Sequence, residues 1–139
     1  MPEDAKSLVR RFYEEVGAGN LGVIDELVAD DFIDHEEFPG LEPSKEGVKK
    51  FFAMLSSAFP DLRMEVHEML ADGDLVSARV IATGTQQGDF MGMPSSGKHV
   101  KVQVFDIVRI RDRQVSEHWG LMDAMTMMQQ LGGIPEFPA

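Results

Sequence analysis

DRQVSEHWGLMDAMTMMQQL, from Asp112 to Leu131, is the stretch that decides how the C-terminal half of the chain folds. Its first part, 115–122, has the composition of a strand, and its second part that of a short helix. Asp123 stands at the junction, with His118 and Trp119 just upstream. A carboxylate at a strand end beside an aromatic side chain is a candidate proton-transfer group if the strand lines a pocket. Aspartate is also a preferred N-cap residue, so a structural interpretation stands beside the catalytic one.

The segment before this stretch, 99–111, alternates in the manner of a long strand. Asp106 is the single polar residue on a face that is otherwise aliphatic. Burial raises the pKa of a carboxyl group unless a charge or donor compensates, and active-site acids are often made in this way. A structural ion pair with Arg79 or Arg109 is the alternative. The opposite face of the strand carries Gln103 and Phe105.

Farther upstream, the period of apolar residues changes from helical to alternating at Leu62. Helices are predicted over 3–16, over 21–28 with Asn20 as its cap, and from Ser44 to before Pro60. Strands follow over 62–70, with Leu70 on the same face as Met64, and over 75–85. Helices grouped before strands predict an α+β fold with an antiparallel sheet, and the length of 139 residues predicts a single domain, 1–139.

Composition excludes several classes of protein. The formal net charge of −11 argues against a nucleic-acid partner, and the absence of cysteine excludes disulfides and thiolate sites. No apolar run has the length of a membrane span, and the N-terminus does not resemble a signal peptide, so we expect a cytoplasmic protein without a membrane partner. His35-Glu36 and His67-Glu68 both lack the second histidine of a zinc helix, so we expect neither a metal nor another cofactor.

Several segments together resemble the SnoaL-like polyketide cyclase (ester cyclase) family. They are DHEEFPG (34–40), AFPDL (58–62), GDLVSAR (73–79), GDFMGMPSSGK (88–98), FDIVRI (105–110), EHWGLMD (117–123) and QQLGG (129–133). They cover nearly the whole chain in the right order. The resemblance implies the cone-shaped α+β barrel of the nuclear transport factor 2-like superfamily, with N-terminal helices packed on a curved sheet.

The same resemblance implies a cofactor-independent, intramolecular aldol closure of a polyketide ester. An acidic side chain would take a proton from carbon and return one to the developing alkoxide. Carried over by motif, Asp123 is the general acid/base, and we add His118 as a second catalytic candidate, although an ideal strand would put the two on opposite faces. The expected substrate-binding positions are His35, Gln86, Phe90, Gln103, Phe105, Asp106, Arg109 and Trp119.

Gln86 stands where the family pattern commonly has a histidine. Glutamine can donate a hydrogen bond to an oxyanion but cannot transfer a proton at neutral pH. An isomerase or an epoxide hydrolase on the same fold, or a non-catalytic binder of small apolar ligands, are the alternative functions. The expected ligand is a flat, largely apolar carbonyl or polyketide-like compound. The barrel that the resemblance implies leaves a broad sheet face that usually needs a partner, so we expect a homodimer or a higher oligomer.

Overall fold

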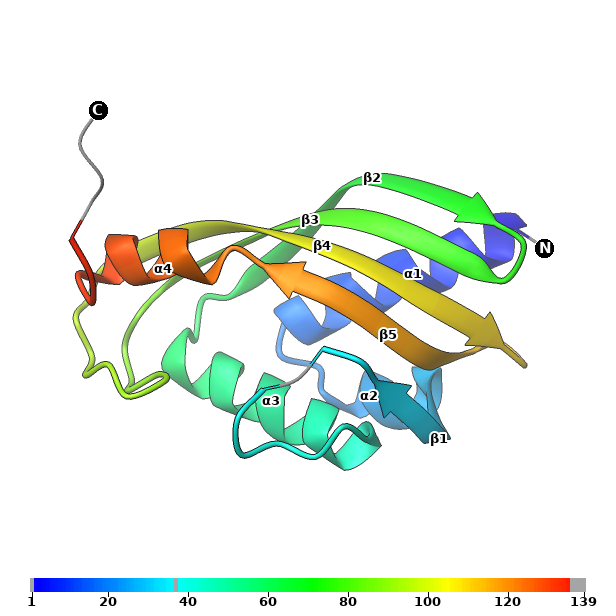
Figure 1. Ribbon diagram of the computed structural model, residues 1–139, viewed down its shortest axis with the longest axis horizontal. Coiled ribbons are helices and arrows are strands. Elements are labelled where there is room, and N and C mark those ends of the chain that lie inside the picture. The colour runs from blue at the N-terminus through cyan, green and yellow to red at the C-terminus, as the bar shows by residue number, and fades with distance from the viewer. Residues whose placement is uncertain (1, 37, 136–139) are drawn as a thin grey trace.

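In the computed structural model, which describes residues 2–36 and 38–135, the helices pack on one curved sheet (Figure 1). The elements are α1 (Pro2–Gly17), α2 (Gly22–Leu27), β1 (Val28–Asp34), α3 (Lys45–Ala58), β2 (Arg63–Asp72), β3 (Leu75–Thr85), β4 (His99–Arg111), β5 (Gln114–Met122) and α4 (Ala124–Leu131). The strand order is β1-β5-β4-β3-β2, and every neighbouring pair is antiparallel except β1 and β5. The predicted α+β class is confirmed.

The core lies between the sheet and the helices α1, α2 and α3, which cover one of its faces (Figure 1). In β4 the buried residues alternate with exposed ones, so that Val102 and Val104 face the helices whereas Phe105 faces outward. Asp106 is buried on the same face as these valines, as its place in the alternation predicts. None of the described helices is both long and apolar enough to cross a bilayer.

Strand β2 departs from the predicted alternation. Its pairing with β3 shifts register between Val66 and Glu68. Because a bulge of this kind reverses the side-chain direction beyond it, Met64 is 7% exposed whereas Leu70 is 73% exposed. The prediction that Leu70 and Met64 share a face was therefore wrong.

Strand β1 was not predicted, and its first residue, Val28, was assigned to the preceding helix. The strand has no strict alternation, since Val28 and Ala29 are both buried, and its register against β5 shifts before Ile33. The predicted cap Asn20 was also wrong. Helix α2 begins after Leu21 without a side-chain cap, and the Asn20 amide instead donates to Glu15.

The junction between β5 and α4 is capped by Asp123. Its carboxylate accepts a hydrogen bond from the Thr126 backbone N–H at 3.1 Å and another from the Thr126 hydroxyl at 2.6 Å. Helix α4 ends at Gly132, whose φ of 82° lies in the left-handed region that favours glycine. The structural interpretation of Asp123 as an N-cap is confirmed.

Two substitutions of Asp123 show whether its hydrogen bonds as a cap or its negative charge stabilises the folded protein. Asparagine caps a helix about as well as aspartate, whereas alanine typically costs about 1 kcal/mol. We expect Asp123→Ala to lower the free energy of unfolding by about that amount and Asp123→Asn to leave it nearly unchanged, as measured by urea denaturation. Equal losses in both variants would contradict capping as the source of the stability.

Candidate functional site

A cavity of about 310 Å³ lies between the sheet and the helices. Its walls are mainly apolar, with aromatic side chains from α1, β1, α3 and the segments that follow β1 and α3: Phe12, Phe32, Phe38, Phe51, Phe52 and Phe59. The volume is at the lower end of the range for small-molecule sites. A group of polar side chains also lines the cavity: Tyr13, Asp34, Glu36, Glu42, Thr83, Asp106 and His118.

The pairing of β4 with β5 brings two of these polar residues together. Asp106 lies opposite Gly120, and Val108 lies opposite His118. The side chains of Asp106, Val108 and His118 all line the cavity from these two neighbouring strands. A Cβ atom at position 120 would come within 2.1 Å of Asp106 Oδ1 and within 2.7 Å of His118 Nε2. Glycine at position 120 is therefore required for the approach of Asp106 to His118.

The His118 ring is held between two carboxylates. Its Nδ1 lies 2.8 Å from Asp34 Oδ1, and its Nε2 lies 2.7 Å from Asp106 Oδ1. The second oxygen of Asp106 accepts a hydrogen bond from the buried Tyr13 hydroxyl. A continuous chain of polar contacts thus links α1, β4, β5 and the end of β1.

These contacts set the charge of the group. Burial opposes a positive charge on His118, but the hydrogen bonds to Asp106 and Asp34 outweigh it and raise the pKa of His118 to about 10. Burial, followed by the negative charge of Asp106, raises the pKa of Tyr13 well above its ordinary value. At neutral pH, His118 is therefore an imidazolium and Tyr13 a neutral hydrogen-bond donor.

Glu36 completes the polar group, two residues beyond the end of β1. Its Oε1 lies 3.8 Å from His118 Nε2, and its side chain is 15% exposed. Burial raises the pKa of Glu36 to about 7, against the attraction of the His118 charge, while the charges of Asp106 and Asp34 raise it further. Among the described residues, no donor forms a hydrogen bond with the Glu36 carboxylate.

Glu36, Asp106 and His118 each offer one atom of a metal-ligating type, and these atoms lie within 4.8 Å of one another. A histidine binds a metal through a neutral ring nitrogen, so a cation at this position would have to displace a proton that Asp106 or Asp34 holds on His118.

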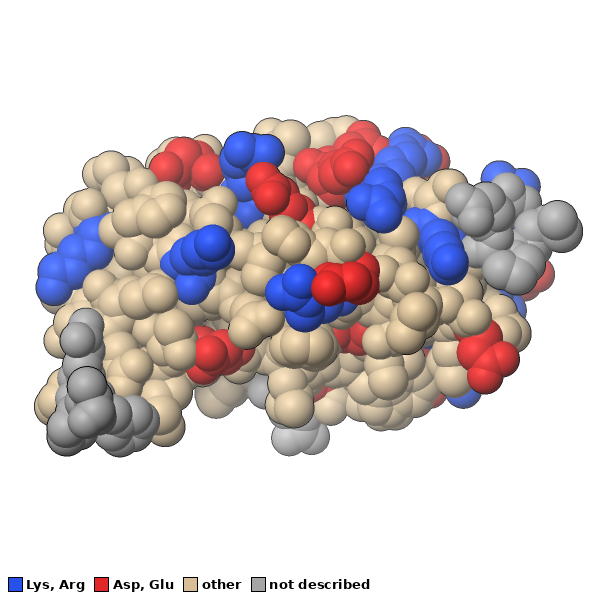
Figure 2. Space-filling view, turned by 90° about the horizontal axis from the view of Figure 1, so that it is seen from above, with Lys and Arg blue, Asp and Glu red and all other residues tan. Residues whose placement is uncertain are grey.

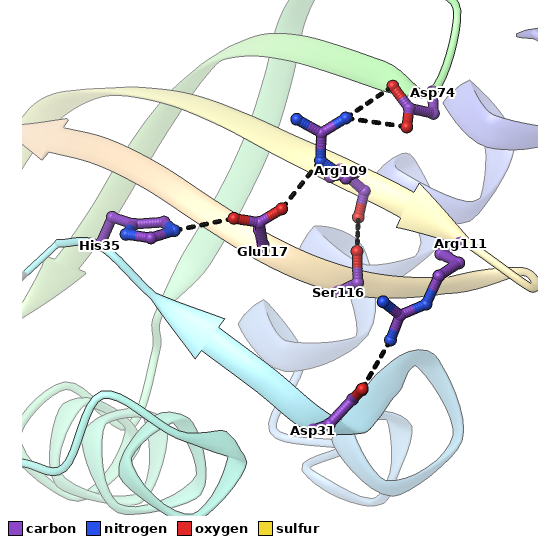
Figure 3. Close-up of polar contacts among 7 residues, drawn as sticks. All are labelled: Asp31, His35, Asp74, Arg109, Arg111, Ser116 and Glu117. Atoms are coloured by element: carbon purple, nitrogen blue, oxygen red, sulfur yellow. Dashed lines mark hydrogen bonds and ion pairs between the residues drawn. The ribbon is translucent and has the colours of Figure 1, made fainter.

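The opposite face of the sheet holds a second polar network (Figure 3). Arg109 donates to Glu117 at 2.8 Å and to Asp74 at 2.8 Å, and His35 Nε2 lies 2.9 Å from the other Glu117 oxygen. His35 also stacks on Trp119 with ring centroids 4.8 Å apart. Three predicted pocket residues, His35, Arg109 and Trp119, thus come together, but outside the cavity.

Gln103 and Phe105 lie on that outer face as well, because they alternate with the inward-facing residues of β4. Gln103 accepts a hydrogen bond from Arg79 at 3.1 Å, and Phe105 is 54% exposed. Substrate binding by these residues stays a prediction that the cavity does not support.

Gln86 and Phe90 are buried, but they do not line the cavity. The Gln86 amide donates to the Met93 carbonyl at 3.1 Å and accepts from the Ser96 hydroxyl at 2.6 Å, which ties together the loop after β3. Phe90 packs edge-on against Phe59, a residue of the cavity wall, at 5.5 Å between centroids. Phe90 therefore supports the wall from behind, whereas Gln86 holds the loop together.

Asp123 is exposed at the start of α4 and is not among the residues that line the cavity. The hydrogen bonds from Thr126 lower its pKa, which weakens the carboxylate as a base. Of the two predicted catalytic residues, His118 and Asp123, the structure brings only His118 to the cavity.

Four residues of the site escaped the analysis of the sequence: Tyr13, Asp34, Glu36 and Gly120. Tyr13 looked like one more apolar residue of an amphipathic helix, although it is the single tyrosine of the chain. Asp34 and Glu36 belong to the quoted segment 34–40, in which only the histidine was singled out. Gly120 follows Trp119 directly and gave no signal of its own.

The charge on His118 predicts a loss of stability at alkaline pH. The folded protein keeps a proton on His118 up to about pH 10, whereas the unfolded chain releases it near pH 6.5. Because the native state binds the extra proton, this contribution is fully present below pH 6.5 and is lost as the pH rises to about 10. Urea denaturation across this range should show the decline in the parent and a smaller one in His118→Gln. Equal declines would contradict a protonated His118.

Comparison with known proteins agrees with the fold. The family model of the SnoaL-like polyketide cyclases matches residues 7–131. Two aklanonic acid methyl ester cyclases, DnrD of Streptomyces peucetius and DauD of Streptomyces sp. (strain C5), are each 26% identical over 132 residues; the alignments span 90% of this chain and 88% and 80% of theirs. The structure of TsrD from Streptomyces laurentii superposes with a TM-score of 0.88 at 25% identity, over 96% of this chain and 98% of TsrD. The chain belongs to the SnoaL-like polyketide cyclase family.

Proposed function

We propose that this protein is a cofactor-independent cyclase that closes a ring in a polyketide ester by an intramolecular aldol reaction. The observation that carries the proposal is His118, held between Asp34 and Asp106 in the wall of a mainly apolar cavity. Membership of the family and the similarity to aklanonic acid methyl ester cyclases point to the same substrate class.

The reaction needs a means to stabilise negative charge on oxygen. When a proton leaves the carbon beside a carbonyl group, charge develops on the carbonyl oxygen, and a preorganised donor in an apolar site stabilises it strongly. His118 acts here as a fixed positive charge, because Asp34 and Asp106 engage both of its ring N–H groups and hold its orientation. The apolar walls bind the flat carbon skeleton and exclude water.

Asp106 is a suitable position for testing the proposed function, because asparagine preserves the shape of the side chain but removes its charge. We expect Asp106→Asn to slow the conversion of aklanonic acid methyl ester by about a hundredfold or more, the usual effect of losing a group that stabilises the transition state. The measurement is chromatographic, since the cyclised product is an isomer of equal mass, and thermal melting checks that the variant folds.

The matched control is Asp123→Asn, the same chemical change at the exposed cap. We expect it to retain the activity of the parent. A loss of activity in Asp123→Asn, with an active Asp106→Asn, would return the acid/base role to Asp123 and would overturn the assignment to the cavity.

We also propose that the outer face of the sheet associates with a second copy of the chain. Phe105 and Leu121 are cross-strand partners and are 54% and 78% exposed, and Ile107 beside them is 42% exposed. Viewed from above, the molecule shows charges of both signs interleaved with other residues (Figure 2). Because a chain with a net charge of −11 repels its copies, a face with paired charges and an apolar centre suits self-association best.

Light scattering tests this association. We expect the parent to have at least the mass of a dimer at micromolar concentration, and Leu121→Glu to shift it toward the monomer because a charge would enter the apolar centre. Met54→Glu, at an exposed position on α3 with 44% exposure, is the control that should leave the mass unchanged. A monomeric parent would refute the proposal.

A further inference from the structure

Building on the proposed function, we infer that Glu36 is the group that takes the proton from carbon, acting from a niche that Gly120 leaves open. Glu36 lines the cavity, and a Cβ atom at position 120 would lie 2.7 Å from its Oε1. The missing side chain of Gly120 is thus what admits the carboxylate to the polar group.

Glu36 differs from the other carboxylates that line the cavity. Asp34 and Asp106 are each bound to the His118 ring, and Asp106 also accepts from Tyr13. Glu42 is exposed and contacts only the Ser44 hydroxyl, at 3.4 Å, among the contacts of the described side chains. A base must have a free lone pair in reach of the substrate. Within the described part of the cavity wall, Glu36 is the half-buried carboxylate that meets this condition.

The groups around Glu36 also give its carboxylate a basicity that suits proton abstraction from carbon. His118, Asp106, Asp34 and Tyr13 are the ionisable groups that face Glu36 from the neighbouring elements. With burial, their combined effect leaves the pKa of Glu36 at about 7. A base with a pKa near the working pH is available as carboxylate and still strong enough to accept a proton.

In the proposed reaction, the proton that Glu36 takes from carbon is the one that it later returns to oxygen. Glu36 accepts it as the C–H bond breaks, and the electron pair of that bond passes into an enolate whose oxygen faces the His118 imidazolium. The enolate carbon then forms the new C–C bond to a second carbonyl carbon, whose oxygen becomes an alkoxide. Protonated Glu36 returns its proton to this alkoxide, so the protein ends in its starting state.

Kinetics with aklanonic acid methyl ester test the role of Glu36. We expect kcat/KM of the parent to rise with pH up to about pH 7 and then to level off, as Glu36 becomes carboxylate. Glu36→Gln should lose about a hundredfold or more of the activity and the inflection near pH 7. Glu14→Gln, the same chemical change at an exposed glutamate of α1 that does not line the cavity, should keep both. A Glu36→Gln variant with the activity and pH profile of the parent would overturn the inference.

A second readout does not need a substrate. Infrared spectra of the parent and of Glu14→Gln should show a carboxyl C=O band that titrates near pH 7 and is missing from Glu36→Gln. If the parent fails to convert the ester but shows this band, the proposed function fails for that substrate, whereas the half-buried, protonatable Glu36 stands. If no band depends on Glu36, the inference is overturned whatever the activity.

Discussion

The ion pairs of His118 with Asp34 and Asp106 are the interaction on which the arrangement of the site depends. They join the end of β1 to β5 and β4, and the Tyr13 hydroxyl extends the connection to α1. Buried charges are tolerated only when each has its partners, and here each carboxylate is paired with one ring nitrogen of the imidazolium. The position of β1 beside β5, and therefore of the segment that carries Glu36, is tied to this pairing.

The same interaction explains why the cavity remains open beside a polar group. His118, Asp34, Asp106 and Tyr13 satisfy one another and need no water from the apolar space beside them, whereas the Glu36 carboxylate is left to face that space. Aromatic and aliphatic side chains form the remaining walls. The result is a hydrophobic chamber in which charge is concentrated at one place on the wall, and electrostatic effects are strongest in such surroundings.

The sequence predicted the elements with strict periodicity well, and β3 and β4 have the bounds that their alternation indicated. It also marked Asp106 as the polar residue of a buried face. Alternation shows that a strand has two faces but does not show which face meets the helices. The resemblance to the family assigned Trp119 to the pocket together with its neighbour His118, and the structure places the two on opposite faces of the sheet. The roles of Tyr13 and Glu36 arise from contacts between segments far apart in the chain, which no local pattern reports.

The register of β5 has a consequence for how this protein can change during evolution. His118 and Gly120 face the cavity, whereas Glu117, Trp119 and Leu121 face outward beside Arg109 and Phe105. A one-residue insertion or deletion within β5 would exchange the two sets, placing an indole where the imidazolium stands and removing the apolar centre of the outer surface. A change in the length of β5 would therefore alter the cavity and the outer surface at once. Substitutions in this strand can change one face and leave the other as it is.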